Sequence, residues 1–319
     1  MNRDIETQSY PLIGSIQNSV GMGFLGNQAV YAVANNLGAR VICAQSMFSS
    51  AHGGFTGRSS VIAEPQQFRR DLAFLISQRP AVLIVGFLPR PNLVDITANM
   101  LADYKGVVVL DPVIGDYKKG LYVSEETARG IKQQLLPLAQ IITPNRFEAE
   151  VLLGIPPDPN TTEHQFLNGL YDLGPESVII KSFERDRDKQ RCKLLFTNGY
   201  SYYRIEAPYY SAYPAHGVGD VFAAGVATLV ALGGSPFAAT LVSTALAARS
   251  VANSTSYGGA TVDPIAALEK WRPLGYQIED DKTMKFCERS GVTSESIKPS
   301  AQDGPRLKFA PPKNKIIYW

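Results

Sequence analysis

The sequence predicts an α/β protein in which helices cover both faces of a mainly parallel sheet, giving three layers. Two observations lead to this prediction. Apolar runs such as VLIVG and VVVLD show no alternation with polar residues, as expected of strands that are buried on both faces. These runs also take turns with longer segments of helical periodicity along most of the chain, which favours repeated strand–helix–strand units.

The expected strands and helices alternate from residue 12 to residue 180. The strands are Leu12–Ile16, Arg40–Ala44, Ala81–Val85, Gly106–Leu110, Ala139–Ile142 and Ser177–Ile180. The helices are Asn27–Leu37, Phe68–Gln78, Leu93–Tyr104, Glu125–Leu136 and Phe147–Leu153.

The pattern changes after Lys181. Cys192–Phe196 and Ser201–Ile205 predict an antiparallel hairpin, because the Asn198-Gly199 pair between them suits a type I′ turn. Two apolar helices, Asp220–Leu232 and Pro236–Ala252, are expected next. The small, polar and Gly-rich stretch Ser46–Ser60 predicts a flexible flap over a pocket.

Composition and charge exclude several classes of protein. The 319 residues are 45% hydrophobic and 19% charged, as in ordinary globular proteins, and the net charge of +2 is too balanced for a protein that neutralises many nucleic-acid phosphates. Three cysteines give no disulfide or zinc pattern. The start of the chain lacks the apolar core of a secretory signal, and the longest weakly polar run, Val221–Gly234, is too short to span a bilayer. We therefore expect a cytoplasmic protein with no membrane and no nucleic-acid partner.

Residues 281–319 differ from the rest of the chain. They contain eight basic and four acidic residues, and prolines and glycines interrupt any periodicity. We expect a basic C-terminal extension there, without a second core, and one domain over residues 1–280.

Carboxylates follow two expected strands at their C-terminal ends, where parallel sheets bind ligands. Asp111 and Asp116 flank a Pro/Gly turn and suit Mg²⁺ or water beside a phosphate. The alternative is an Asp-Pro turn with Asp116 as a solvated cap, which accounts for most isolated Asp-Pro pairs. Asn145 and Glu148 begin the next helix. They fit a capping box as well as a place close to a metal-bound phosphate.

The sharpest motif is His216-Gly217-Val218-Gly219-Asp220 at the start of an apolar helix. Two glycines let backbone N–H groups converge at the helix N-terminus, which attracts anions. Asp220 would accept a proton from a substrate hydroxyl while these N–H groups stabilise a transferring phosphoryl group. The alternative is an N-capping Asp after a Gly turn.

These motifs, in this order, resemble the ribokinase-like superfamily and, within it, the pyridoxal kinases. The resemblance rests on Asp111-Pro112-Val113-Ile114-Gly115-Asp116, Thr143-Pro144-Asn145, Phe147-Glu148 and the Gly217–Asp220 motif, and it extends from about Leu12 to about Ala252. It implies a ribokinase-like kinase domain over 1–280 and transfer of phosphate from Mg²⁺-bound ATP to the 5′-hydroxymethyl group of pyridoxal, pyridoxine or pyridoxamine, a vitamin B6 salvage reaction. It also implies a homodimer, and leaves a monovalent cation such as K⁺ as a further cofactor.

The resemblance also assigns roles to residues. Asp220 would be the base, and Gly217, Val218 and Gly219 would form the anion hole. The expected nucleotide-binding residues are Asp111, Asp116, Tyr122, Thr143, Asn145, Glu148, Lys181 and Ser182, with adenine near Ala207 and Pro208. Asp111 and Glu148 would lie at the metal, and Ser15, His52 and Asp220 would contact the vitamin.

Departures from the pattern concentrate at the vitamin and leave two alternatives. Asn18-Ser19 stands where many relatives have Ser-His, and His52 matches only loosely. A hydroxymethylpyrimidine-type kinase is one alternative, although that branch usually has Cys where this chain has Asp220. A non-catalytic protein that binds pyridoxal phosphate or nucleotide is the other.

Overall fold

The computed structural model describes residues 10–210, 216–254, 261–268 and 281–298. The strands are β1 Leu12–Val20, β2 Arg40–Ser49, β3 Ser60–Ile62, β4 Val82–Val85, β5 Val107–Leu110, β6 Gly115–Asp116, β7 Gly120–Leu121, β8 Ile141–Ile142, β9 Ser177–Asp186, β10 Arg191–Thr197, β11 Tyr202–Pro208 and β12 Thr293–Ser296. The helices are α1 Asn27–Leu37, α2 Pro65–Ser77, α3 Pro91–Leu101, α4 Glu125–Gly130, α5 Arg146–Leu153, α6 Glu163–Tyr171, α7 Val218–Ala231, α8 Pro236–Ala252, α9 Pro264–Leu268 and α10 Asp281–Arg289.

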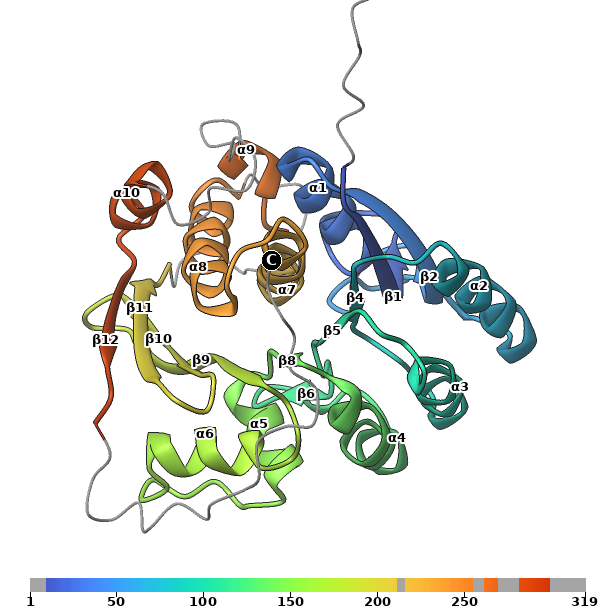
Figure 1. The fold of residues 1–319 in the computed structure, drawn as a ribbon, viewed down its shortest axis with the longest axis horizontal. Coiled ribbons are helices and arrows are strands. Elements are labelled where there is room, and N and C mark those ends of the chain that lie inside the picture. The colour runs from blue at the N-terminus through green and yellow to red at the C-terminus, as the bar shows by residue number, and fades with distance from the viewer. Residues whose placement is uncertain (1–9, 211–215, 255–260, 269–280, 299–319) are drawn as a thin grey trace, which may run out of the picture.

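One large sheet forms the middle layer of the described structure (Figure 1). Its strand order is β12-β11-β10-β9-β8-β5-β4-β1-β2-β3. The six central strands, from β9 to β2, run parallel, whereas β10, β11, β12 and β3 are antiparallel to their neighbours. All six strands that the sequence predicted before residue 181 are the parallel ones, so this part of the prediction is confirmed.

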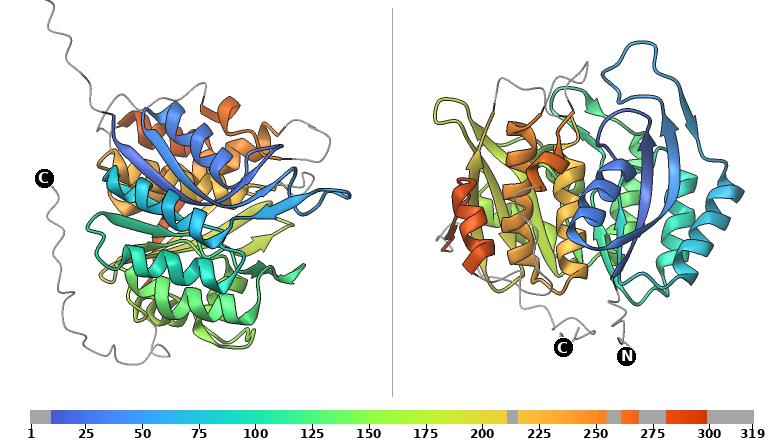
Figure 2. Two further views of the ribbon diagram at one scale, coloured as in Figure 1. Left: turned by 90° about the vertical axis from the view of Figure 1, so that its right-hand side faces the viewer. Right: turned by 90° about the horizontal axis from the view of Figure 1, so that it is seen from above.

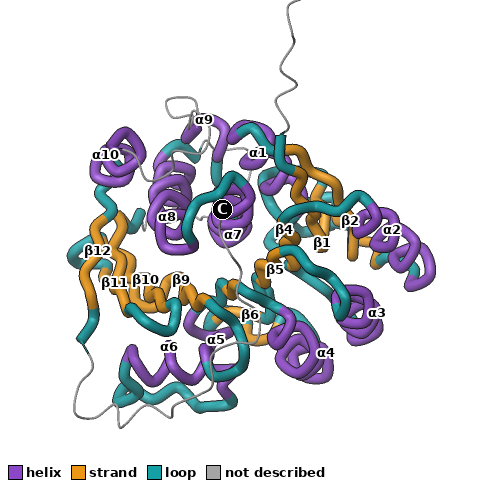
Figure 3. The backbone as a smooth tube through the Cα atoms, viewed as in Figure 1, coloured by secondary structure: helices purple, strands orange, loops and turns teal. Residues whose placement is uncertain are grey.

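Helices cover both faces of the sheet, as Figure 3 shows. One face packs against α1, α7 and α8 through a core that includes Val30, Val226 and Leu246. The other face packs against α2, α3, α5 and α6 through a second core that includes Phe68 and Phe166. The three-layer α/β architecture is therefore confirmed.

The expected flap is partly regular structure. Strand β2 continues to Ser49 and pairs with β3, so that only residues 50–59 form the loop, which we call the flap. Figure 2 shows this hairpin extending from the edge of the sheet. The sequence reading ended the strand at Ala44 because the small polar residues after it lack the apolar pattern of a buried strand.

Two other predictions differ from the structure in detail, and one helix was not predicted. The hairpin of β10 and β11 is present, but its turn is not type I′, because Asn198 does not have the positive φ that this turn requires. Instead, the side chain of Asn198 accepts hydrogen bonds from the N–H groups of Tyr200 and Ser201. The helix expected over Glu125–Leu136 changes after Gly130 into a π-helical turn, Ile131–Leu135. Helix α6 was not predicted, although Thr162 and Gln165 form a capping box at its start.

The beginning of the C-terminal extension is regular structure, which the fading periodicity did not predict. Helix α10 packs on α8, and β12 pairs with β11 at the sheet edge. The strand was missed because all four of its side chains are exposed. The proline-rich residues 299–319 and the chain start, residues 1–9, lie outside the described residues. No helix among the described residues is long and apolar enough to cross a bilayer.

Candidate active site

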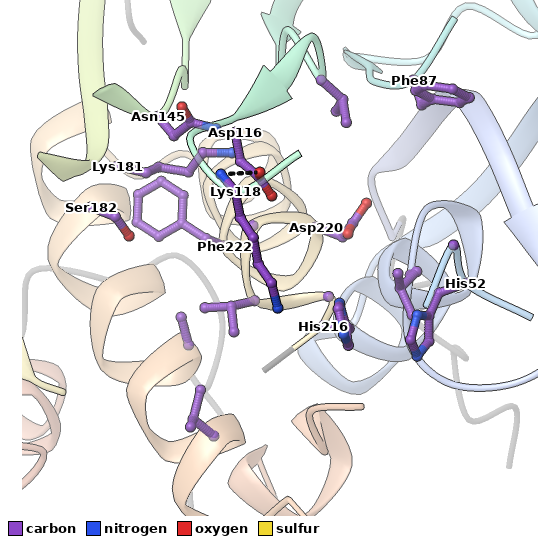
Figure 4. Close-up of a pocket in the computed structure, with 18 of the residues that line it drawn as sticks. His52, Phe87, Asp116, Lys118, Asn145, Lys181, Ser182, His216, Asp220 and Phe222 are labelled. Carbon is purple, nitrogen blue, oxygen red and sulfur yellow. Dashed lines mark hydrogen bonds between the residues drawn. The ribbon is translucent and has the colours of Figure 1, made fainter. Parts of the chain in front are cut away.

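A cavity of about 1030 Å³ opens at the C-terminal ends of the parallel strands. Figure 4 shows Phe87 and His52 toward one end, Lys181 and Ser182 toward the other, and Asp220 between them. We call these the Phe87 end and the Ser182 end. A cavity of this size suits two small-molecule substrates side by side.

The N-terminus of α7 contributes the centre of the cavity wall. Gly217 has a φ of +93°, and a Cβ there would lie 2.2 Å from the backbone oxygen of Phe24. Only glycine fits such a position. Gly217, Val218 and Gly219 all line the cavity, so the first N–H groups of α7 face the space where an anion would bind.

Asp220 lies in the first turn of α7 and lines the same cavity. Its Oδ1 accepts a hydrogen bond from the N–H of Gly26 at 2.9 Å. Burial and the negative charge of Asp111 raise the pKa of Asp220 to about 6, against the opposing effects of Gly26 and Lys181. A carboxylate with this pKa is deprotonated at neutral pH and still basic enough to take up a proton.

Lys181 ends the apolar part of β9 and places its ammonium group among carboxylates. Its Nζ is 2.5 Å from Asp111 Oδ1, and Glu148 and Asp220 also act on it electrostatically. Burial favours the neutral amine, but Asp111 and Glu148 outweigh it and hold the pKa of Lys181 above its ordinary value. The side chain therefore presents a fixed positive charge to the cavity.

Glu148 has the structural role that the capping box predicts. Its oxygens accept the N–H groups of Asn145 at 2.7 Å and Ile114 at 3.1 Å, so that it connects the start of α5 to the loop after β5. Burial, with a smaller contribution from Asp111, raises its pKa. Asn145 completes the cap and itself lines the cavity.

The β6–β7 hairpin covers part of the cavity. Asp116 accepts hydrogen bonds from Tyr122 and from the N–H groups of Lys118 and Lys119, which outweigh burial and lower its pKa. Lys118 and Lys119 also line the cavity and were not among the predicted site residues. A signal for them was present, because two adjacent cations stand one residue after the Asp111–Asp116 motif.

The structure brings most of the predicted site residues to this one cavity. Those that line it are His52, Asp116, Tyr122, Asn145, Lys181, Ser182, Ala207, Pro208, Gly217, Val218, Gly219 and Asp220. Asp111 and Thr143 do not line it. The hydroxyl of Thr143 donates a hydrogen bond to Asp111 Oδ1 at 3.1 Å, and Asp111 forms an ion pair with the cavity residue Lys181. Glu148 also lies outside the lining.

Ser15, predicted to contact the vitamin, is not among the residues that line the cavity. It is fully buried, and its hydroxyl donates to Asn27 Oδ1 at 2.6 Å and accepts from Gln17 Nε2 at 3.0 Å. Asn18 and Phe87 line the cavity instead. Neither was predicted as a site residue: Asn18 lies in β1, beyond the strand end expected at Ile16, and Phe87 lies in the loop after β4.

The residues present supply only part of a metal site. Within the described chain, no group of three or more His, Cys, Asp or Glu side chains is arranged to hold a metal ion. Thr143 and Lys181 both donate to Oδ1 of Asp111, and both oxygens of Glu148 accept backbone N–H groups. This donor set fits Mg²⁺ that receives most of its ligands from water and a nucleotide.

Comparisons with known proteins agree with this geometry. Residues 58–265 match the model of the phosphomethylpyrimidine kinase family. The pyridoxal kinase PdxY of Corynebacterium diphtheriae is 26% identical over 66% of this chain and 77% of its own length. The human pyridoxal kinase is 29% identical over 53% of this chain and 57% of its own length.

Solved structures show the same fold. The pyridoxal kinase of Staphylococcus aureus in complex with ADP has a TM-score of 0.76 and 19% identity, and the match covers 91% of this chain and all of that one. A putative phosphomethylpyrimidine kinase of Bacteroides thetaiotaomicron, solved with pyridoxal, has a TM-score of 0.73 and 22% identity over 91% of this chain. The ribokinase-like fold is thus confirmed, and because the family model spans most of the chain, this protein belongs to the phosphomethylpyrimidine kinase family.

Proposed function

We propose that this protein is a pyridoxal kinase, which transfers the γ-phosphoryl group of ATP to the 5′-hydroxymethyl group of pyridoxal, and also of pyridoxine or pyridoxamine. The observation that carries the proposal is Asp220, a base with a pKa of about 6, held beside the glycine-lined N-terminus of α7 in a cavity large enough for both substrates. The names of the relatives support pyridoxal as the acceptor.

Asp220 would accept the proton of the substrate hydroxyl as the oxygen attacks the γ-phosphorus. The new oxygen–phosphorus bond forms while the bond to the β-phosphate oxygen breaks, and ADP leaves with that electron pair. The N–H groups at the start of α7 stabilise the negative charge on the transferred group. Placing the acceptor at the Phe87 end and the nucleotide at the Ser182 end puts Asp220 between them.

The nucleotide half would use positive charge near the phosphates and the Ala207–Pro208 segment beside the base. Lys181, held by Asp111 against movement, would face the phosphates, and Lys118 and Lys119 would approach them from the β6–β7 hairpin. Ala207 and Pro208 would flank the adenine, next to Ser182. Tyr122, whose hydroxyl donates a hydrogen bond to Asp116, would cover the phosphates.

Mg²⁺ would accompany ATP, with Asp111 and Glu148 on the protein side of the ion. When bound, it neutralises phosphate charge and so favours transfer. The protein keeps these two carboxylates in place through Thr143, Lys181 and the capping box at α5. A monovalent cation such as K⁺ is a further cofactor proposal, to be checked by comparing activity in KCl and NaCl.

The remaining proposals concern the whole protein. We propose a cytoplasmic homodimer with one kinase domain over residues 1–280 and a basic extension over residues 281–319. In the described part of that extension, α10 packs on α8, and β12 pairs with β11 and so continues the same sheet. Sedimentation of the purified chain at several concentrations tests the homodimer.

Phosphorylation of hydroxymethylpyrimidine is the second candidate function, and the matched family is named after a related pyrimidine acceptor, phosphomethylpyrimidine. A coupled assay with Mg²⁺ and ATP, run separately on pyridoxal, pyridoxine, pyridoxamine and hydroxymethylpyrimidine, distinguishes the two when products are identified by mass. We expect phosphorylated pyridoxal. Product from hydroxymethylpyrimidine alone would replace the proposal, and ATP binding without any product would indicate a non-catalytic binder.

A further inference from the structure

Two histidines from distant parts of the chain meet at the cavity. The rings of His52, in the flap, and His216, directly before the Gly217–Asp220 motif, stack with centroids 4.1 Å apart and an interplanar angle of 28°. Both residues line the cavity, and Figure 4 shows the two rings side by side. Residues 50–59 otherwise connect two strands at the far edge of the sheet, so this contact ties the flap to the start of α7.

Local bonds fix the His52 side of the contact. Nδ1 of His52 accepts the N–H of Gly54 at 3.0 Å, and the rings of His52 and Phe55 form a T-shaped contact with 4.7 Å between centroids. His52 is only 6% exposed although it lies in a loop. Nδ1 is thus the accepting nitrogen of this ring.

The β6–β7 hairpin approaches the same point. A Cβ at Gly53 would lie 3.7 Å from Nζ of Lys119, so the flap tip lies between this hairpin and the start of α7. Flap, hairpin and α7 therefore converge beside Asp220, at the place where the two substrates would meet.

We propose that His52 and His216 are positioning residues that latch the flap onto the start of α7 and so close the Phe87 end of the cavity over the acceptor substrate. This role rests on the proposed function for the identity of that substrate, whereas the latch itself is a property of the free protein. An aromatic pair of this kind contributes enough to shift an open–closed equilibrium of a surface loop between about twofold and tenfold.

The surroundings of the latch make it sensitive to acid. The pKa of His216 is lowered by its burial and by the neighbouring His52, Lys119 and Lys118, whereas Asp116 raises it. These groups come from the flap and from the β6–β7 hairpin. A lowered pKa in the closed state means that the latch is fully stable above the ordinary histidine pKa of about 6.5 and weakens as the pH falls below it.

Hydrogen exchange of the flap amides in the free protein tests the latch without any catalysis. We expect His216→Ala to speed exchange at Gly54 and Phe55 between about twofold and tenfold, and His216→Phe, which keeps a stacking ring, to restore most of the protection. His164→Phe is the matched control, because the third histidine lies in α6 against Tyr202 and does not line the cavity. Unchanged flap exchange in His216→Ala would overturn the proposal.

Two further readouts separate a latch from a merely structural contact. After correction for intrinsic rates, flap exchange in the wild type should speed up below pH about 6.5, and this pH dependence should vanish in His52→Phe/His216→Phe. In turnover assays, His216→Ala should raise KM for pyridoxal while leaving KM for ATP within about twofold. A pH dependence that survives in the double variant, or an equal rise in both KM values, would refute the latch. Absence of all kinase activity, with the exchange results as expected, would refute only the proposed function.

Discussion

Replacement of Asp220 by Asn removes the base with little change of shape. Asn keeps an oxygen at the position that accepts the N–H of Gly26 at 2.9 Å, so the start of α7 should retain its structure. The carbonyl oxygen of an amide cannot take up the proton of the acceptor hydroxyl at neutral pH. The variant therefore separates proton transfer from substrate binding.

The size of the effect follows from the position of the carboxylate. A positioned general base contributes about 10²- to 10⁴-fold, or about 3 to 5 kcal/mol of the barrier, and we expect kcat to fall by that factor. The free energy of unfolding of this variant should rise although its kcat falls. The pKa of Asp220 is raised from 3.8 to about 6, so the folded protein is penalised for its charge at high pH. Removing that charge should increase the free energy of unfolding at pH 8 by up to about 3 kcal/mol.

The assay combines turnover, nucleotide binding and thermal unfolding. The kcat of Asp220→Asn should fall while the affinity for ATP stays within about threefold, and its Tm at pH 8 should equal or exceed that of the wild type. Wild-type kcat/KM should fall about tenfold per pH unit below pH 6, as the base becomes protonated. Asp158→Asn, in a loop outside the cavity, is the control for both measurements. A kcat within tenfold of the wild type, or a large loss of Tm, would contradict the assignment of Asp220 as the base.

Three other variants test separate parts of the site. Lys181→Met leaves the buried Asp111 and Glu148 without their cation and should lower the free energy of unfolding by about 3 to 5 kcal/mol. Urea titrations should show a smaller loss of this free energy at pH 5 than at pH 8, because the carboxylates are more protonated at pH 5; an equal loss at both would argue against the carboxylate cluster as its cause. Lys119→Gln should raise KM for ATP about threefold to tenfold and make this KM less dependent on salt concentration. Lys105→Gln, outside the cavity, should change neither quantity. If KM for ATP depends on salt in the same way in both variants, Lys119 is not part of the nucleotide site. Gly217→Ala forces a side chain at a φ of +93° to within 2.2 Å of the Phe24 oxygen and should abolish nucleotide binding and lower Tm. Gly57→Ala, with a φ of +76° and open space around it, is the matched control for strain alone, and an equal fall of Tm in both would show that the contact with Phe24 does not matter.

Local patterns in the sequence determined the layers of this protein and which segments form its central strands. Runs such as Val82–Val85 and Val107–Leu110 are apolar on both faces and so identify themselves as central strands without any partner in view. The cap at Asn145 and the glycines around Val218 are likewise local, because the residues that interact are neighbours in the chain. The position of Asp220 at the head of α7 follows from the same short motif.

The sequence alone could not decide features that depend on contacts between distant segments. Strand β12 has four exposed side chains and forms only because its backbone pairs with β11. The hydroxyl of Ser15 donates a hydrogen bond to Asn27, twelve residues later, which no motif reveals. The pKa values of Asp220 and Lys181 arise from carboxylates and burial contributed by other elements. The pairing of His52 with His216 joins the flap to α7 across most of the chain. Periodicity and capping act over a few residues and can be read locally, whereas burial, charge coupling and ring stacking depend on distances that only the folded chain fixes.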